Sequence, residues 1–162
     1  MGFFHNLMVK LGRYRLIPDR RTGEDYMHRY YLFLKDRKWF PFNLTLHKIV
    51  KSDDPIFHDH PWPYMTVVLK GGYWEHRIGQ PRKWRGVGSI CFRKSTDLHW
   101  VETDPFTDTW TLFMHGKRQR DWGFIVNNQW IHFAVSRSGS TMRSYINGTL
   151  VDTTSNSTNF SS

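Results

Sequence analysis

His58-Asp59-His60-Pro61-Trp62 is the most informative segment of this sequence. Side chains two residues apart in a β-strand point to the same face, so His58 and His60 can direct two imidazoles at one point. Neutral imidazole is the commonest side-chain ligand of borderline divalent metals. The chain contains 9 histidines, however, so an HxH pair alone can arise by chance and needs support from its surroundings.

Two glycine-bounded segments and a third histidine supply that support. The run from Tyr64 to Gly71 has the composition of a strand followed by a turn, and Gly71 lies eleven residues after His60. Gly88 opens a second strand-like run that ends at Arg93, and His99 follows Gly88 by the same interval. This joint spacing is much more specific than the HxH pair.

Over residues 40 to 116 the arrangement resembles the two motifs of the cupins. The resemblance implies an all-β fold, the cupin-type double-stranded β-helix or jelly roll, with a short N-terminal helix or arm in this chain. It also implies that His58, His60 and His99 converge inside the barrel on one divalent metal ion. Fe(II) is the first expectation for that ion, and Ni, Zn and Mn are the alternatives.

The sequence departs from the cupins at one ligand position. Cupins usually supply a glutamate four residues beyond the second histidine, where this chain has Tyr64. A neutral phenol with a pKa near 10 is a poor metal ligand, so the set resembles the three histidines of cysteine-dioxygenase-type cupins. Glu75 is the alternative source of a carboxylate, as a fourth ligand or, like Tyr64, as a catalytic acid or base. Glu75 can equally be a solvated strand residue.

A closer resemblance is to the small single-domain cupins of bacteriophage and bacterial genomes, and it extends the match to residues 28–131. We therefore expect a cupin domain over residues 1–131 with its core at 28–131. The resemblance implies a fold and leaves the activity open. The stretches that carry it are Leu46-His47-Lys48, Ser52-Asp53-Asp54, the HxH segment, Gly71-Gly72-Tyr73-Trp74-Glu75, Phe92-Arg93, Asp97-Leu98-His99, Trp110-Thr111-Leu112-Phe113 and Arg120-Asp121-Trp122-Gly123-Phe124.

Short strands separated by turn signals are expected after residue 30, which is typical of a sandwich or barrel. Before them, the apolar spacing of residues 3–16 predicts an amphipathic helix, and the charged stretch 19–25 predicts a loop. The expected strands cover residues 30–34, 42–50, 65–69, 73–78, 89–93, 99–102, 109–114 and 123–126, with 73–78 returning from 65–69 as a hairpin.

The last part of the chain, residues 132–162, differs from the rest. Trp130–Ser136 and Tyr145-Ile146-Asn147-Gly148 resemble a hairpin of the laminin-G-like, concanavalin-type sandwiches. Asn147-Gly148 is a strong hairpin-turn signal. About thirty residues are too few for such a sandwich, so we expect an appended β-hairpin, followed by a frayed Ser/Thr/Asn-rich end over 153–162.

Composition narrows the classes of protein and partner. The single Cys91 excludes an internal disulfide and favours a reducing cytoplasm, that of a bacterial host if the gene is of phage origin. The sequence has neither a signal-peptide pattern nor an apolar run long enough to span a membrane. The net charge of +9 is scattered along the chain, which argues against a nucleic-acid face. An unpaired sheet edge is a candidate surface for a homodimer.

Three functions remain open. The first is a metal-dependent enzyme acting on a small molecule, either a dioxygenase or a Lewis-acid enzyme such as an isomerase. The second is a non-catalytic protein of phage origin that binds a metal, a small ligand or a carbohydrate. The third is binding of nucleic acid through the basic surface.

Overall fold

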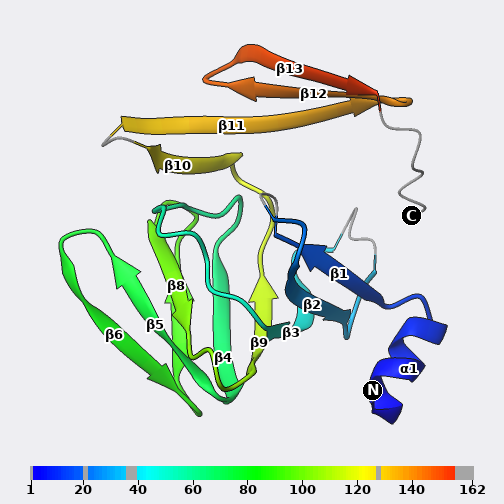
Figure 1. Cartoon of the computed structure of the whole chain (residues 1–162), viewed down its shortest axis with the longest axis vertical. Coiled ribbons are helices and arrows are strands. Elements are labelled where there is room, and N and C mark those ends of the chain that lie inside the picture. Colours follow the sequence, from blue (N-terminus) through cyan, green and yellow to red (C-terminus); the bar gives the residue numbers. More distant parts are fainter. Residues whose placement is uncertain (1, 20–21, 36–39, 127–128, 156–162) are drawn as a thin grey trace.

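The computed structural model describes residues 2–19, 22–35, 40–126 and 129–155, and its regular secondary structure is almost entirely β-strand (Figure 1). One short helix, α1, precedes thirteen strands among these residues. No helix in these ranges is both long and apolar enough to cross a membrane. The elements are α1 (Phe3–Lys10), β1 (Tyr14–Pro18), β2 (Asp25–Tyr31), β3 (Asn43–Ile49), β4 (Tyr64–Lys70), β5 (Gly72–Arg77), β6 (Gln80–Gly86), β7 (Ile90–Arg93), β8 (His99–Thr103), β9 (Thr109–His115), β10 (Trp122–Val126), β11 (Gln129–Ser138), β12 (Thr141–Ile146) and β13 (Thr149–Ser155).

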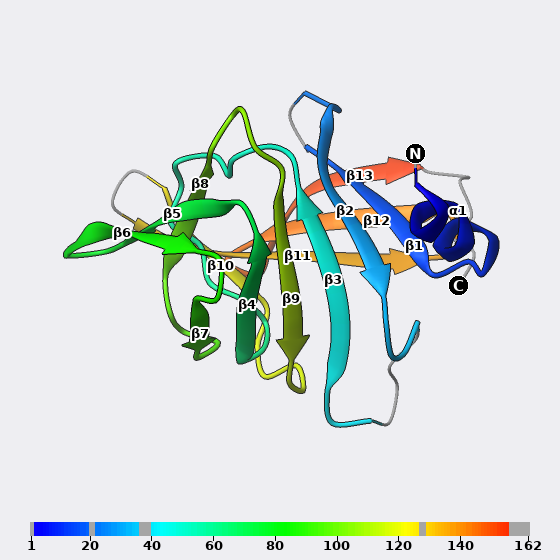
Figure 2. The same cartoon turned by 90° about the horizontal axis from the view of Figure 1, so that it is seen from below.

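The first sheet contains six strands in the order β1-β2-β3-β9-β4-β7, and every neighbouring pair is antiparallel. Figure 2 shows these strands side by side across the front of the molecule. Burial alternates along β3 and along the first five residues of β4, because successive side chains of a strand point to opposite faces. The more buried face of this sheet forms one wall of the interior.

Opposite it lie a three-stranded sheet, β6-β5-β8, and a four-stranded sheet, β10-β11-β12-β13. The segment around His58 joins the two, because His58 forms isolated β-bridges with His99 of β8 and with Phe124 of β10. The backbone of Phe57–Asp59 therefore acts as a short connecting strand inside the second wall. The metal-ligand candidates lie at this junction.

The expected hairpin at Gly71-Gly72 is instead a corner between the two walls. β4 pairs with β9 and β7 in the first sheet, whereas β5 pairs with β6 and β8 in the second. Gly71 has φ 69°, and a Cβ there would lie 2.7 Å from the carbonyl oxygen of Asp108. Both the positive φ and the close approach require glycine at this corner.

Other differences from the sequence-based expectations concern short elements. The helix ends at Lys10, and residues 14–18 form β1 because the chain reverses at Gly12, which has φ 63°. Asp25, placed in a loop by its charge, opens β2. With β1 and β2 in the first sheet, the sheet begins well before residue 28. Asp36-Arg37-Lys38, whose charged side chains predict a polar turn after the strand expected at 30–34, lies outside the described residues.

The C-terminal part is a three-stranded meander rather than a single hairpin. β11 begins at Gln129 and pairs with β10, and β12 and β13 follow in antiparallel order (Figure 1). Asn147-Gly148 forms the turn between β12 and β13, with φ 49° and 81°. Residues 153–155 of the expected frayed end belong to β13, and residues 156–162 lie outside the described ranges.

Candidate metal centre

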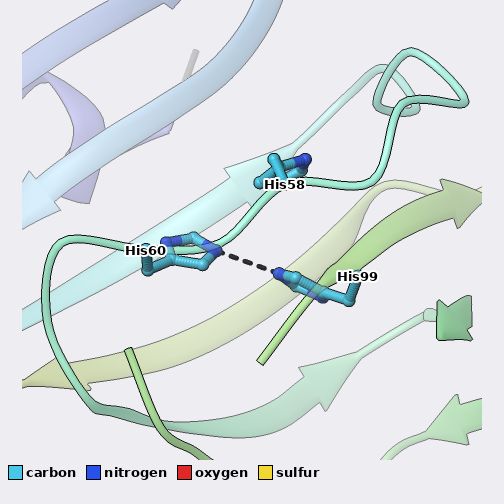
Figure 3. Close-up of side chains that lie close together, drawn as sticks. All are labelled: His58, His60 and His99. Carbon is cyan, nitrogen blue, oxygen red and sulfur yellow. Dashed lines mark hydrogen bonds between the residues drawn. The ribbon is translucent and has the colours of Figure 1, made fainter. Parts of the chain in front are cut away.

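His58, His60 and His99 lie together at the junction of the second wall (Figure 3). Two backbone hydrogen bonds of 3.0 Å pair His58 with His99, which places their side chains next to each other. Asp59, between the two histidines of the HxH segment, points the other way and accepts a hydrogen bond of 2.7 Å from the backbone N–H of Gly123. The segment is extended as expected, but apart from the bridge at His58 it is not part of a regular strand.

The ligand atoms of the three histidines all lie within 4.8 Å of one another. Nε2 of His60 and Nε2 of His99 are 2.9 Å apart (Figure 3), and the Tyr64 hydroxyl lies 3.0 Å from the same His99 nitrogen. Metal–nitrogen bonds of about 2.0–2.1 Å at octahedral or tetrahedral angles place two ligating nitrogens about 2.9–3.4 Å apart. The pair His60–His99 therefore already has the spacing of two ligands of one ion.

The protonation of these imidazoles also fits a metal site. Burial, reinforced by the neighbouring histidines, holds the pKa of His60 well below its usual value. Burial, followed by the charge of His58, lowers the pKa of His99 to about 3. Nδ1 of His58 lies 3.2 Å from the carbonyl oxygen of Ile56, which favours a proton on Nδ1 and leaves Nε2 free to bind a metal. Neutral imidazoles are the form that binds metals.

Glu75 lies beside this group without belonging to it. Its carboxylate is 3% exposed and accepts hydrogen bonds from Arg85 at 2.7 and 2.9 Å and from Arg93 at 2.6 and 2.8 Å. Burial raises the pKa of Glu75, but these bonds outweigh burial and keep it below its usual value. The alternative that Glu75 is a solvated strand residue is wrong, since the side chain is buried.

One oxygen of Glu75 is 3.8 Å from Nδ1 of His99. That nitrogen is buried and has no hydrogen-bond partner within the described part of the chain. A carboxylate behind a ligating histidine commonly fixes its tautomer and ring orientation. The geometry thus suits Glu75 to positioning His99 better than to coordinating the ion.

Tyr64 occupies the place where cupins usually carry a glutamate, and its hydroxyl reaches the site. Burial raises the pKa of Tyr64 well above its usual value. The phenol therefore remains protonated near neutral pH and can donate a hydrogen bond to His99 or to a bound molecule. As a neutral donor, Tyr64 can take part in proton transfer, whereas its phenolate is not available as a ligand.

The three histidines line a cavity of about 560 Å³ between the two walls. This volume is in the range of small-molecule sites. The walls are rich in groups that can hydrogen-bond; besides the histidines, Tyr64 and Glu75, the lining includes Arg29, Tyr26, His47, Asp53, Thr66, Tyr73, Cys91, Arg93 and Thr111. The rings of Phe113, Trp122 and Phe124 supply apolar surface, and Arg15, Asp19 and Asp54 add further charged groups.

Asp53 and Arg29 are among the lining residues that were not identified as functional from the sequence. Asp53 lies 4.0 Å from Nε2 of His58, accepts from the backbone N–H of Val101 at 2.8 Å and accepts from the Tyr26 hydroxyl. It belongs to the stretch Ser52-Asp53-Asp54 that carries the family resemblance, so a signal for it existed. Arg29 has no such signal, because only the pairing of β2 with β3 brings it into the cavity.

No protein-family model matches this chain, and no curated protein matches it. Solved structures do match. DMSP lyase DddQ from Ruegeria pomeroyi is 19% identical, and the match covers 67% of this chain and 58% of the lyase chain with a TM-score of 0.53. The polyketide cyclase RemF from Streptomyces resistomycificus is 19% identical over 66% of this chain and 77% of its own, with a TM-score of 0.52.

A third structure is a predicted oxalate decarboxylase from Thermotoga maritima, 20% identical over 64% of this chain and 91% of its own, with a TM-score of 0.50. Structural neighbours of this chain are cupin or double-stranded β-helix proteins. The chain therefore has the cupin-type double-stranded β-helix fold with a short N-terminal helix, as the resemblance implied. At these identities the likeness concerns the fold alone.

Proposed function

We propose that this protein is a metal-dependent enzyme of the cupin fold that acts on a small molecule. The observation that carries the proposal is the convergence of His58, His60 and His99 in the wall of a 560 Å³ cavity. Three imidazoles leave further coordination positions open, as catalytic metal sites require. We place Fe(II) first, with Ni, Zn and Mn as alternatives, and propose the cytoplasm, of a bacterial host if the gene is phage-derived, as its compartment.

A divalent ion at this site would supply Lewis-acid chemistry, and Fe(II) would add oxygen chemistry. The chain's own groups then have distinct tasks. Tyr64 offers a proton 3.0 Å from the His99 nitrogen, and Glu75 orients His99 from behind. The rings of Phe113, Trp122 and Phe124 offer apolar surface against which the substrate can pack.

The test is metal content. After reconstitution and gel filtration, we expect about one divalent ion per chain in the wild type and in His76→Ala, and almost none in His60→Ala, because three imidazoles form one site. His76 is a matched control on β5, where its ring stacks on Trp100 at 3.6 Å and bonds to Glu102. Equal metal content in the wild type and His60→Ala would refute the site. Oxygen consumption with candidate substrates then separates an oxygenase from the alternative enzymes and from a non-catalytic binding protein.

We also propose that residues 132–162 are an appendage that the metal site does not need. Deleting them should leave a chain that binds metal, because the ligand segment pairs with β8 and β10, which end before residue 127. Solubility should fall, since the pairs Trp122–Phe133 and Gly123–His132 are lost and β10 becomes a partly open edge. Metal analysis and gel filtration measure both effects.

A truncated chain without the far-ultraviolet spectrum of a β protein would contradict that proposal and show that the appendage supplies core structure.

In the full chain, β13 is exposed along its whole length and forms one edge of its sheet. We propose this edge as the surface through which two copies would pair.

A further inference from the structure

Arg29 is a cationic lining residue of the cavity whose charge the proposed metal chemistry does not use; Arg15, Asp19 and Asp54 are further charged residues of the lining. It lies on β2, directly across from His47 of β3 and from Arg15 of β1. Arg29 and the three histidines line the same cavity. The rings between them are in contact: His47 stacks on Phe113 at 4.9 Å, and Phe113 lies 6.3 Å from His60.

The hydrogen bonds of Arg29 leave most of its guanidinium unused. Nε donates to Nε2 of His47 at 3.1 Å, and the nearby Tyr31 side chain favours the charged form of the guanidinium. An arginine side chain has five N–H donors. Among the described residues no carboxylate oxygen lies within 4 Å of Arg29, whereas Arg85 and Arg93 share the carboxylate of Glu75.

A guanidinium that lies half-buried in a cavity wall without a carboxylate partner is unfavourable in free energy. Burial lowers the pKa of Arg29, and the positive charge of Arg15 acts in the same direction. Charged groups inside proteins are normally paired or hydrogen-bonded throughout, because an uncompensated charge loses its hydration without replacement. The planar fork of arginine matches the two oxygens of a carboxylate or the oxygens of a phosphate. The surroundings of Arg29 therefore favour the binding of an anion to its guanidinium.

We infer that Arg29 binds an anionic oxygen group, a carboxylate or a phosphate, of a small-molecule substrate whose reacting part lies at the histidine site. That a reaction takes place at the histidines rests on the proposed function. The negative charge of the substrate is inferred from Arg29 alone. One cavity holds both groups, so a single small molecule can contact both. The substrate class is therefore a small organic acid or phosphate ester.

The experiment is a ligand-observed NMR titration of the full chain with acetate, inorganic phosphate and acetamide. Acetate and acetamide have nearly the same shape and differ in charge. We expect acetate or phosphate to bind the wild type and acetamide to bind far more weakly. In Arg29→Gln the affinity for the bound anion should fall about 10- to 100-fold, the usual effect of losing hydrogen bonds to a charged group. The preferred anion distinguishes a carboxylate from a phosphate substrate.

Two further variants keep the result interpretable. Arg29→Lys retains the charge without the fork and should lie between the wild type and Arg29→Gln. Arg82→Gln removes a 52% exposed guanidinium outside the cavity and should bind as the wild type does. Thermal unfolding of each variant confirms that it is folded. Equal anion affinity in folded Arg29→Gln and wild type, or no anion binding to the wild type at millimolar concentration, would overturn the inference.

Metal analysis separates this inference from the proposed function. Arg29→Gln should keep its full metal content, because Arg29 is not one of the grouped metal-ligand candidates. His60→Ala should lose the metal but keep an anion affinity that depends on Arg29. An Arg29-dependent anion site in a protein that binds no metal would refute the proposed function and leave the anion site standing. Metal binding without an Arg29-dependent anion affinity would refute the anion site and leave the proposed function standing.

Discussion

Replacing Glu75 by glutamine should lower the free energy of unfolding by about 3–5 kcal/mol, the usual cost of breaking a buried ion pair from one side. Arg85 and Arg93 would both lose their shared carboxylate, and their side chains are only 15% and 9% exposed. Neither guanidinium can deprotonate to escape the cost. Urea denaturation followed by circular dichroism measures the change.

The matched control is Glu102→Gln. Glu102 is also on a strand of the second wall and also pairs with two basic groups, His76 and Arg82, but its side chain is 39% exposed. Solvent screens such pairs, so its loss should cost no more than about 1 kcal/mol. Similar losses in Glu75→Gln and Glu102→Gln would show that the buried cluster has no special role.

Glu75→Gln also tests the positioning of His99. With the carboxylate replaced by a neutral amide, the Nδ1 atom of His99 loses the negative charge that lies 3.8 Å away. Metal affinity should fall about 10- to 100-fold, as it does when groups behind a ligating histidine are removed. A folded Glu75→Gln that binds metal with unchanged affinity would mean that Glu75 only neutralises the two arginines.

The metal-free protein should lose stability steeply as the pH falls below about 6.5, the usual pKa of histidine. His47 and His99 are buried and His60 is half-buried, and loss of hydration is the main reason that all three pKa values are lowered in the folded state. In the unfolded chain they take up protons near pH 6.5, so acid favours unfolding. Each such histidine contributes up to about 1.4 kcal/mol per pH unit.

Because the three histidine pKa values are lowered in the folded state, their stabilising contribution is complete at a pH above the pKa of the unfolded chain. It declines as the pH falls towards the pKa of the folded state. For His99 the decline continues to about pH 3. Urea titrations of EDTA-treated protein between pH 7 and 4.5 measure the slope, and a His99→Gln variant should be shallower by the contribution of one histidine. The same slope in both proteins would contradict the burial of His99 as a neutral imidazole.

Much of the fold could be predicted because the relevant signals are local. β3 and β4 have alternating burial, and their sequences are rich in apolar and β-branched residues. The helix at the N-terminus also follows from local spacing, although its end does not. β6 was missed because its residues are polar and mostly exposed, so only its pairing with β5 defines it as a strand. Pro81 is tolerated there because β6 is an edge strand.

The all-β cupin fold and the three histidines were predictable from the chain alone, because the spacing of the motifs resembles that of the cupins. The surroundings of Glu75 and Arg29 could be found only in the folded structure. Glu75 meets Arg85 and Arg93 through the pairing of β5 with β6 and the packing of β7 nearby, and Arg29 enters the cavity through the register of β2 with β3. Such partners are set by contacts between distant segments, which no local pattern encodes. The difference between the buried, paired Glu75 and the half-buried Arg29, which has no carboxylate partner among the described residues, therefore becomes visible only when the walls of the cavity are assembled.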